Sequence, residues 1–195
     1  MGLFSFFNKK YDMDTLEGIN TIPVPAKNYN TGDPTKDCIY YILQRKATEH
    51  KKNGRIDLAI ACLRKSNQLS DYEAKPLLTQ KEYMRLIKYI ESTGDFQLAQ
   101  KELDLINTRH PEFLDKRVSN LLRIKEALQK NKEWKNDLVY ITTNKSCPLC
   151  SPYDHKIYSI SGKNPKYPKL PTEFSKDGGF CPKCIVGITN YFDTL

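Results

Sequence analysis

Two short motifs near the C-terminus carry the residues best suited to chemistry. Both have the form Cys-Pro-x-Cys: one runs from Cys147 to Cys150 and the other from Cys181 to Cys184. A gap of two residues lets both sulfurs of a pair reach one ion, and two such pairs fill the tetrahedral shell of zinc. The four cysteines are therefore predicted to hold one structural zinc ion. Since no coordination position stays open, such a site would stabilise the fold and leave no place for catalysis.

Other uses of these cysteines stay open. An iron–sulfur cluster also takes four thiolates, and the spacing does not distinguish it from zinc. A dithiol redox site needs one Cys-x-x-Cys pair at a helix N-terminus, whereas loop or strand follows both pairs here. His155 could serve as a base for a free thiol, but a solvated loop position is favoured. The other two cysteines, Cys38 and Cys62, lie on apolar helix faces and are expected to pack in the core.

Length and hydropathy suit one domain, or one medium domain with a small one. The chain has 195 residues, 39% of them hydrophobic, so it can bury a core. No apolar run approaches the roughly 18 residues of a membrane span, and the first ten residues lack the order of a secretory signal. A cytoplasmic, reducing location is therefore expected, where paired cysteines hold metal more often than they form disulfides.

The charge balance admits a nucleic-acid partner without favouring it. A net charge of +8 is compatible with nucleic acid or another anionic partner. No arginine follows Arg123, however, so the cysteine-containing tail is basic through lysine alone. It lacks the bidentate guanidinium that reads guanine or clamps phosphate. General solubility is the favoured explanation of the charge.

The middle of the chain has a helical period. From about residue 34 to 130, apolar residues recur at three- and four-residue steps, which predicts five helices. Asn53-Gly54 ends the first of them, and Thr79 with Glu82 forms a capping box for the third. Residues 1–36 are predicted to be an apolar and extended arm, because two prolines and several turn formers follow its apolar start.

The helical segment contains a spaced pattern of small and large residues. A small residue stands five positions after each of two glycines, and a large apolar residue nine positions after. The residues in this pattern are Gly54, Ala59, Leu63, Gly94, Ala99 and Leu103, with Pro111 beyond them and Tyr83, Leu86 and Ile90 at large positions of the preceding helix. The pattern resembles tetratricopeptide repeats, which pair two helices around a glycine turn. The two glycines are 40 residues apart, more than the 34 of the family, which indicates an insertion between Asp71 and Leu78.

The resemblance implies antiparallel helical hairpins over residues 37–131, with the fifth helix covering the last apolar face. It also implies a concave surface that binds a segment of another protein. The predicted partner contacts on that surface are Tyr40, Tyr41, Gln44 and Tyr83.

The tail, residues 135–195, is predicted to be a small β-rich, zinc-ribbon-like domain. Three short stretches favour strands, at Leu138–Thr143, Lys156–Ile160 and Ile185–Tyr191. The cysteine pairs and a proline-rich loop separate them. So small a tail has little core, and metal binding would supply folding free energy on the order of ten kcal/mol.

A second resemblance covers the first cysteine pair and its surroundings. The stretch from Cys147 to Tyr153, followed by Lys156 to Gly162, is similar to a cysteine segment of phage minor head proteins. The later cluster of that family tends to include histidine and arginine, whereas this chain has Phe180, Cys181 and Cys184. The resemblance implies a shared zinc module and a bacterial or phage-related origin more than a shared role.

These observations predict a mainly α fold with a small β-rich tail and a non-catalytic protein–protein adaptor with a structural zinc. The alternative is a nucleic-acid-binding module that uses the lysines and tyrosines of the tail, including Tyr153, Tyr158 and Tyr167. No enzymatic activity is expected, because the chain has no phosphate-binding glycine loop, His-Glu-x-x-His helix or nucleophile elbow.

Overall fold

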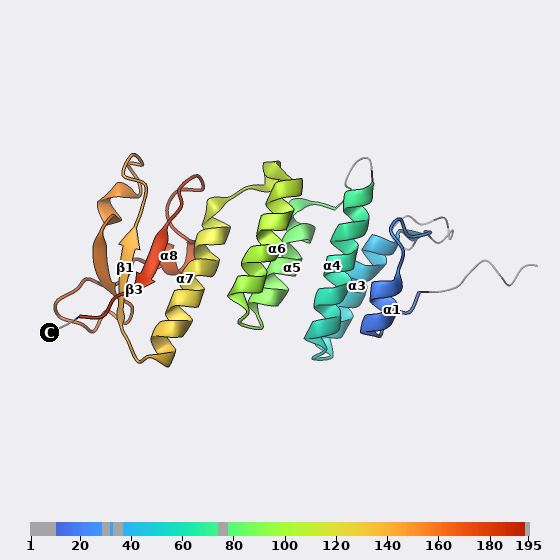
Figure 1. Ribbon diagram of the computed structural model, residues 1–195, viewed down its shortest axis with the longest axis horizontal. Helices are drawn as coiled ribbons and strands as arrows, with labels where there is room; N and C mark the ends of the chain where they lie inside the picture. Colours follow the sequence, from blue (N-terminus) through green and yellow to red (C-terminus); the bar gives the residue numbers. More distant parts are fainter. Residues whose placement is uncertain (1–10, 29–31, 33–36, 74–77, 194–195) are drawn as a thin grey trace, which may run out of the picture. The chain divides into compact units, whose positions relative to one another are not determined.

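The computed structural model describes residues 11–28, 32, 37–73 and 78–193 of the chain. These residues are mainly helical, with one three-stranded antiparallel sheet near the C-terminus (Figure 1). The prediction of a mainly α chain with a small β-rich part is confirmed at this level. Contacts divide the chain into two compact units, Met1–Thr93 and Gly94–Leu195. This division falls within the range 37–131 that the sequence assigns to one helical domain.

The first unit is a layer of helices in which α3 and α4 form a hairpin. Gly54 occupies the turn between them with φ +73°, a conformation that costs glycine least. Ala59 and Leu63 of α4 are fully buried. In chain order the helices are α1 (Leu16–Thr21), α3 (Ile39–Lys52), α4 (Ile56–Tyr72) and α5 (Gln80–Glu91).

The start of α5 agrees with the sequence in detail. The Thr79 hydroxyl accepts the backbone N–H of Glu82 at 3.4 Å, and the Glu82 carboxylate accepts the backbone N–H of Thr79 at 2.7 Å. The predicted capping box is therefore confirmed. It pairs two N–H groups that the helix itself leaves free.

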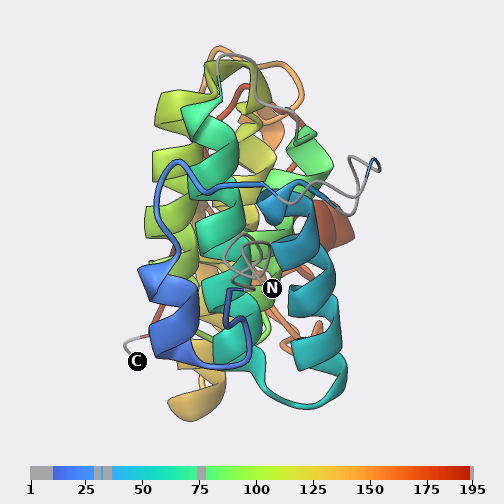
Figure 2. The ribbon, with the colours of Figure 1, turned by 90° about the vertical axis from the view of Figure 1, so that its right-hand side faces the viewer.

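The prediction of an extended arm is wrong for part of it. Residues 16–21 form α1, and the Thr15 hydroxyl accepts the N–H of Gly18 at 3.1 Å to cap it. Met13, Ile19 and Ile22 are buried, and α1 lies against α4 (Figure 2). Burial of these three apolar side chains stabilises the helix. The turn-forming residues nearby were the reason why the sequence predicted an extended segment. Residues 1–10, with the apolar start of the predicted arm, lie outside the described residues.

Overpacking the hairpin is expected to destabilise the first unit. Ala59→Leu adds three carbons at a fully buried position of α4, which should cost about 1–3 kcal/mol of unfolding free energy. Gln68→Leu, at an exposed position of the same helix, is the matched control and should change stability by less than about 0.5 kcal/mol. Denaturant unfolding followed by circular dichroism measures both. Equal stabilities of the two variants would contradict close packing at Ala59.

The second unit combines helices with the sheet. The strand order is β2-β1-β3, and both pairings are antiparallel. In the register of the sheet, Tyr140 of the central strand lies opposite Ile157 and Thr189. In chain order the elements are α6 (Phe96–Arg109), η1 (Pro111–Phe113), α7 (Lys116–Glu133), β1 (Leu138–Thr142), η2 (Ser151–Tyr153), β2 (Lys156–Ser159), α8 (Thr172–Asp177) and β3 (Gly187–Asn190).

The helix α7 shares its core with the sheet. Ile124 of α7 is fully buried in one apolar cluster with Val139, Ile141 and Phe174, and Leu128 packs against it. The resemblance to helical repeats implied that this helix would cover the last face of those repeats. In the structure one face of α7 covers the sheet, because the three short strands need an apolar partner to bury their inner side.

A short helix, α8, lies in the loop that the sequence describes only as proline-rich. It places Phe174, which is fully buried, in the core of the second unit. Gly178 follows it with φ +75°, and a Cβ there would lie 2.0 Å from the carbonyl oxygen of Arg117. Only glycine permits this approach of α8 to α7.

Among the described residues, no helix combines the length and the apolar character that a membrane span requires.

Candidate metal centre

Three of the four predicted ligands lie together. The Sγ atoms of Cys147, Cys150 and Cys184 are all within 4.8 Å of one another. These three side chains are at most 9% exposed, and the half-buried Cys181 packs against the same cluster. In a tetrahedral zinc site with Zn–S bonds of about 2.3 Å, the sulfurs are about 3.8 Å apart. The cluster of three sulfurs is therefore compatible with a thiolate-bound metal ion.

The first cysteine pair forms a tight turn after β1. The backbone N–H groups of Cys150 and Ser151 donate to the carbonyl of Cys147 at 3.1 and 2.8 Å. Those of Leu149 and Cys150 point to the Cys147 sulfur. Hydrogen bonds from backbone N–H groups stabilise a thiolate, so this turn is suited to hold Cys147 as a metal ligand.

Two side chains anchor this turn to the end of β1. Thr143 donates its hydroxyl to the carbonyl of Cys150 at 3.0 Å. Asp154 accepts the backbone N–H of Thr143 at 2.7 Å. These two hydrogen bonds join Thr143, the residue after β1, to Cys150 and Asp154. The strand therefore determines where the cysteine turn lies.

The second cysteine pair is held by α7. Asn120 is 1% exposed, donates through Nδ2 to the carbonyl of Cys184 at 2.8 Å, and accepts the N–H of Val186 at 2.9 Å. The Asn120 amide thus donates to and accepts from the backbone of this loop, as the backbone of a neighbouring strand would. Nearby, the N–H of Lys116 donates to the carbonyl of Pro182 at 2.8 Å. In Figure 1 both cysteine loops and the start of α7 lie at the same end of the sheet.

The pKa values of the clustered cysteines are shifted in opposite directions. A hydrogen bond with the Cys184 thiol, aided by the N–H groups of Cys150 and Leu149, lowers the pKa of Cys147 to about 7. Burial raises the pKa of Cys150 and of Cys184, and hydrogen bonds with neighbouring thiols contribute to both shifts. A divalent cation would stabilise the thiolate form of its cysteine ligands.

Loss of the Asn120 amide is expected to weaken the second cysteine loop. Asn120→Ala leaves the Cys184 carbonyl and the Val186 N–H buried without a partner, which should cost about 2–4 kcal/mol of unfolding free energy. Arg123→Ala, at an exposed position of the same helix, is the control. Denaturant unfolding and the rate of zinc release to a chelator measure the effect. If both variants unfold and release zinc alike, the amide does not hold the loop.

The sequence contains a signal for Asn120 that the spacing of the cysteines does not reveal. Asn120 stands four residues before Ile124, on the buried face of α7. A polar side chain on an apolar helix face usually has a dedicated partner. Its partner here is backbone from the far end of the tail.

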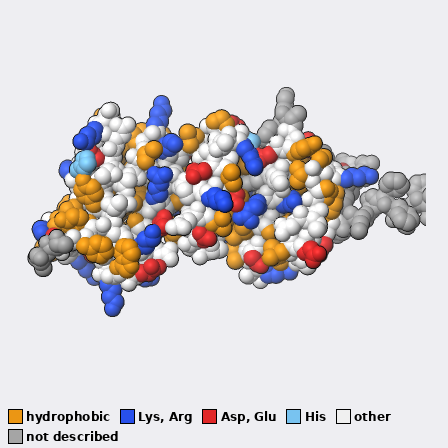
Figure 3. Space-filling model, viewed as in Figure 1, with side chains coloured by type: hydrophobic (Ala, Val, Ile, Leu, Met, Phe, Trp, Pro, Cys, Tyr) orange, Lys and Arg blue, Asp and Glu red, His pale blue; other side chains and the backbone are white. Residues whose placement is uncertain are grey.

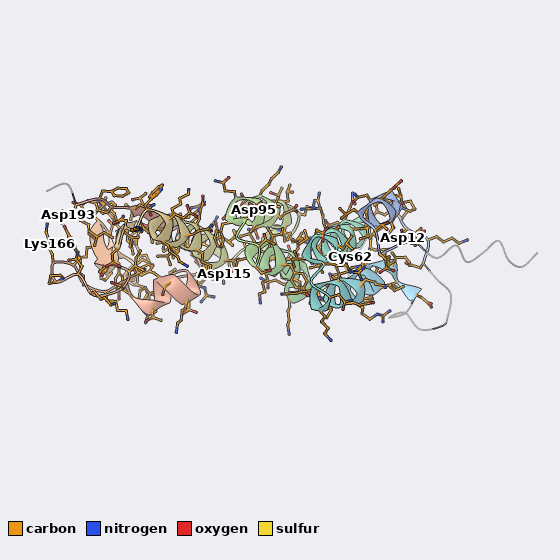
Figure 4. All side chains as sticks on the ribbon, turned by 90° about the horizontal axis from the view of Figure 1, so that it is seen from below. Asp12, Cys62, Asp95, Asp115, Lys166 and Asp193 are labelled. Carbon is orange, nitrogen blue, oxygen red and sulfur yellow. The ribbon has the colours of Figure 1, made fainter. Side chains whose placement is uncertain are left out.

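The remaining two cysteines and His155 are not part of the cysteine cluster. Cys62 of α4 is fully buried, which confirms its predicted place in the core (Figure 4), and burial raises its pKa to about 12. The same prediction is wrong for Cys38, which precedes α3 and is only partly buried because it caps the helix and does not lie on its apolar face. His155 is exposed and contacts the Tyr140 hydroxyl and the Asp154 carboxylate, the latter at 3.4 Å. Within the described residues the ligand group contains no histidine.

The predicted partner contacts lie mostly inside the first unit. Tyr40, Gln44 and Tyr83 are at most 4% exposed. Gln44 accepts a hydrogen bond from Arg85 at 2.6 Å, and the Tyr83 hydroxyl donates to Asp71 at 2.6 Å. Tyr41 is half-exposed. Three of these four side chains therefore serve the packing of the helices in this structure, because their aromatic and amide groups face neighbouring helices.

The tyrosines of the alternative nucleic-acid surface are also largely engaged. Tyr158 is 5% exposed, and Tyr153 stacks on Phe180 at 4.7 Å between ring centres. Tyr167 is half-exposed and donates its hydroxyl to Asp193 at 3.3 Å. The Tyr167 ring also meets Tyr191 edge-on at 6.3 Å between ring centres, and the Lys166 ammonium lies 5.2 Å from its centre.

Comparison with models of known protein families, with curated proteins and with solved structures finds no match for this chain.

Proposed function

We propose that the chain is a non-catalytic adaptor that binds other proteins, and that a zinc-ribbon-like module with one structural zinc ion forms its C-terminal part. The cluster of three buried sulfurs within 4.8 Å of one another, with Cys181 beside it, carries this proposal. Four thiolates complete the shell of zinc, so that the ion would hold two loops together and offer no open position to a substrate.

Two features support a structural site over a redox one. The cysteines come from two loops far apart in the chain, and neither pair opens a long helix, since η2 after Cys150 has only three residues. Three of the four cysteines are also shielded, since Cys147, Cys150 and Cys184 are at most 9% exposed, while Cys181 is half-buried. Reactive dithiols instead need an accessible cysteine with a stabilised thiolate.

The helices provide a scaffold of the kind that adaptors use. Gly54 adopts positive φ in the turn between α3 and α4, and the small residue five positions later, Ala59, is fully buried. Leu63 is also fully buried. These positions support a hairpin like those of tetratricopeptide repeats, in which a small residue permits close helix approach. The partner surface of this part is proposed to include Tyr41, the one half-exposed member of the contacts expected from the sequence.

Affinity capture tests the adaptor function. The zinc-loaded chain should retain specific proteins from an extract treated with nuclease, and the Cys150→Ser variant should lose those that need the metal module. The Cys38→Ser variant should retain them, because Cys38 lies outside the cluster. Capture of no protein, or of nucleic acid only, would contradict the proposal.

One observation favours nucleic-acid binding as a second candidate function. From His155 to Thr172 the chain has four lysines and no carboxylate. Lys166 pairs with Asp193 at 2.9 Å (Figure 4), which leaves Lys156, Lys163 and Lys169 beside the strands. If these three lysines bind phosphates, the affinity for a 12-nucleotide single strand should fall about twentyfold between 50 and 200 mM salt. An affinity that salt leaves unchanged would exclude this candidate.

A further inference from the structure

The first unit contains a half-buried arginine whose hydrogen-bond partners are all neutral. The Arg85 guanidinium of α5 donates to the side-chain oxygen of Gln44 at 2.6 Å and to the hydroxyl of Thr48 at 2.7 Å, both on α3. It also donates to the hydroxyl of Tyr89, one turn further along α5, at 3.2 Å. Within the described residues no carboxylate pairs with this guanidinium. Its charge is therefore held in place by hydrogen bonds without being neutralised, whereas charges removed from water are usually paired.

The acceptors of Arg85 are themselves fixed. Gln44 is 4% exposed, and its amide donates to the hydroxyl of Ser66 at 3.1 Å. Ser66 donates in turn to the carbonyl of Tyr40 at 2.8 Å, and the Thr48 hydroxyl donates to the carbonyl of Gln44 at 3.3 Å. The guanidinium is thus preorganised, so that a ligand which binds it orders little of the chain and saves free energy of association.

A second cation lies beside the same tyrosine. The Lys51 ammonium is 4.1 Å from the centre of the Tyr89 ring, and the central carbon of the Arg85 guanidinium is 5.6 Å from it. Lys51 stands three residues after Thr48, which places both side chains on one face of α3. Lys51 is exposed and forms no ion pair within the described part of the chain. We call Lys51, Arg85 and Tyr89 the cationic site.

The cationic site lacks an acceptor for its donors. Arginine and lysine side chains only donate hydrogen bonds. The Tyr89 hydroxyl accepts from Arg85, and its own proton meets no acceptor among the described residues. Donors from two helices therefore gather around one ring, and an anion with several oxygens is the group that they would bind.

The carboxylates of α3 and α5 are engaged elsewhere. Glu49 of α3 pairs with Lys46 at 3.3 Å. Glu82 belongs to the capping box of α5, and Glu91 at the end of α5 is also engaged. These three are the carboxylates of the two helices, which together carry seven lysines and arginines. The positive charge of the cationic site is therefore not cancelled by its own helices.

The neighbouring helix α4 has a different charge pattern. It contains two carboxylates and two basic side chains. Figure 3 shows the α4 side of the first unit, where lysine and arginine side chains lie among aspartate and glutamate. Asp71 of α4 accepts the hydroxyl of Tyr83 at 2.6 Å. The excess of positive charge thus belongs to the helices α3 and α5, which provide the cationic site.

The charges of the cationic site match a phosphomonoester better than a carboxylate. A phosphorylated side chain carries about −1.5 to −2 charges at pH 7 and has three strong acceptor oxygens. It can neutralise both Lys51 and Arg85 and accept the proton of the Tyr89 hydroxyl. One carboxylate carries a single charge and would leave one of the two cations without a partner.

We propose that the cationic site binds the phosphate group of a phosphorylated side chain in a partner protein. The inference rests on the proposed function, because the phosphate belongs to a protein that the helices hold. Tyr41, the half-exposed residue of the proposed partner surface, stands three residues before Gln44 on α3. The segment around the phosphate therefore continues onto that surface.

Binding of random peptides to the zinc-loaded full chain tests this inference without an identified partner. One set of libraries has a central phosphoserine, phosphothreonine or phosphotyrosine, and the matched libraries have serine or glutamate there. Phosphorylated peptides should be retained, and they should bind at least about tenfold more tightly than their serine and glutamate counterparts.

Two substitutions and a control identify the residues that bind the phosphate. Lys51→Gln, at an exposed position, should weaken the phosphorylated peptides at least about tenfold and leave the fold unchanged by circular dichroism. Tyr89→Phe keeps the ring and should weaken them by a smaller factor. Lys163→Gln removes the same charge at an exposed position of the second unit and should bind as the unmodified chain does.

Three results would overturn the inference: no retained peptide, equal binding of the phosphorylated and glutamate peptides, or equal binding by the Lys51→Gln variant. Thermal stabilisation by inorganic phosphate, beyond that of sodium chloride at the same ionic strength, would also overturn it if no phosphorylated peptide binds. Affinity capture separates this failure from that of the proposed function. If the Lys51→Gln variant and the unmodified chain retain the same unphosphorylated proteins, the adaptor stands and the phosphate site does not.

Discussion

Replacing Cys150 by serine is expected to abolish stable zinc binding and to unfold the sheet of the second unit. Zinc on four thiolates contributes apparent folding free energy on the order of ten kcal/mol, more than a small sheet can lose. Metal analysis of the unmodified chain, purified without added zinc, should give about one zinc per chain. Thermal unfolding with and without a chelator should show a large loss of stability that zinc reverses.

The Cys38→Ser variant is the matched control, since it also removes a thiol but lies outside the cluster. It should keep one zinc per chain and respond to the chelator as the unmodified chain does. A sheet that stays folded after complete metal removal would contradict a structural zinc. An iron content in place of zinc, with visible absorption from thiolate-bound iron, would instead select the iron alternative.

The second large effect is expected at Phe174, the buried side chain of α8. Its ring meets Tyr153 edge-on at 5.2 Å and Phe180 at 5.3 Å, and it shares a core with β1 and α7. Phe174→Ala should lower the unfolding free energy by about 3–5 kcal/mol, because it leaves a cavity that the neighbours fill only in part. Denaturant unfolding of the zinc-loaded chain measures this.

The control for Phe174 is Phe192→Ala, which removes the same side chain at a position 55% exposed. It should cost about half as much or less, since more than half of the Phe192 surface is already exposed in the folded chain. Zinc release offers a further readout, because Phe180 contacts both the Phe174 core and the cysteine cluster. Equal effects of the two substitutions would show that α8 does not contribute to the core.

Local signals predicted the parts of the fold that local interactions determine. The capping box at Thr79 and Glu82 and the turn at Gly54 each depend on neighbours within a few residues, and the structure has both. The three strands appear within a few residues of the predicted stretches, because β-branched and aromatic residues alternate there. The cysteine pairs could also be recognised in the sequence, since the spacing of two ligands within a pair is a local property.

Nonlocal contacts decide what the sequence did not predict. The helix α8 has six residues after a proline and has little intrinsic stability; burial of Phe174 among distant residues favours it. The helix α1 depends in the same way on Ile19 and Ile22. The place of α7 against the sheet follows from Ile124 meeting β1, and an amphipathic pattern alone does not say which surface a helix covers.

The amide of Asn120 has a thermodynamic consequence for the proposed metal module. Since α7 contributes the hydrogen bonds that close the second cysteine loop, the folding of α7 and the binding of zinc are linked equilibria. Linkage is reciprocal: whatever factor an ordered α7 adds to the affinity for zinc, bound zinc adds to the folding constant of α7. The stability of this helix would therefore rise and fall with the free zinc concentration, although no residue of α7 binds the ion.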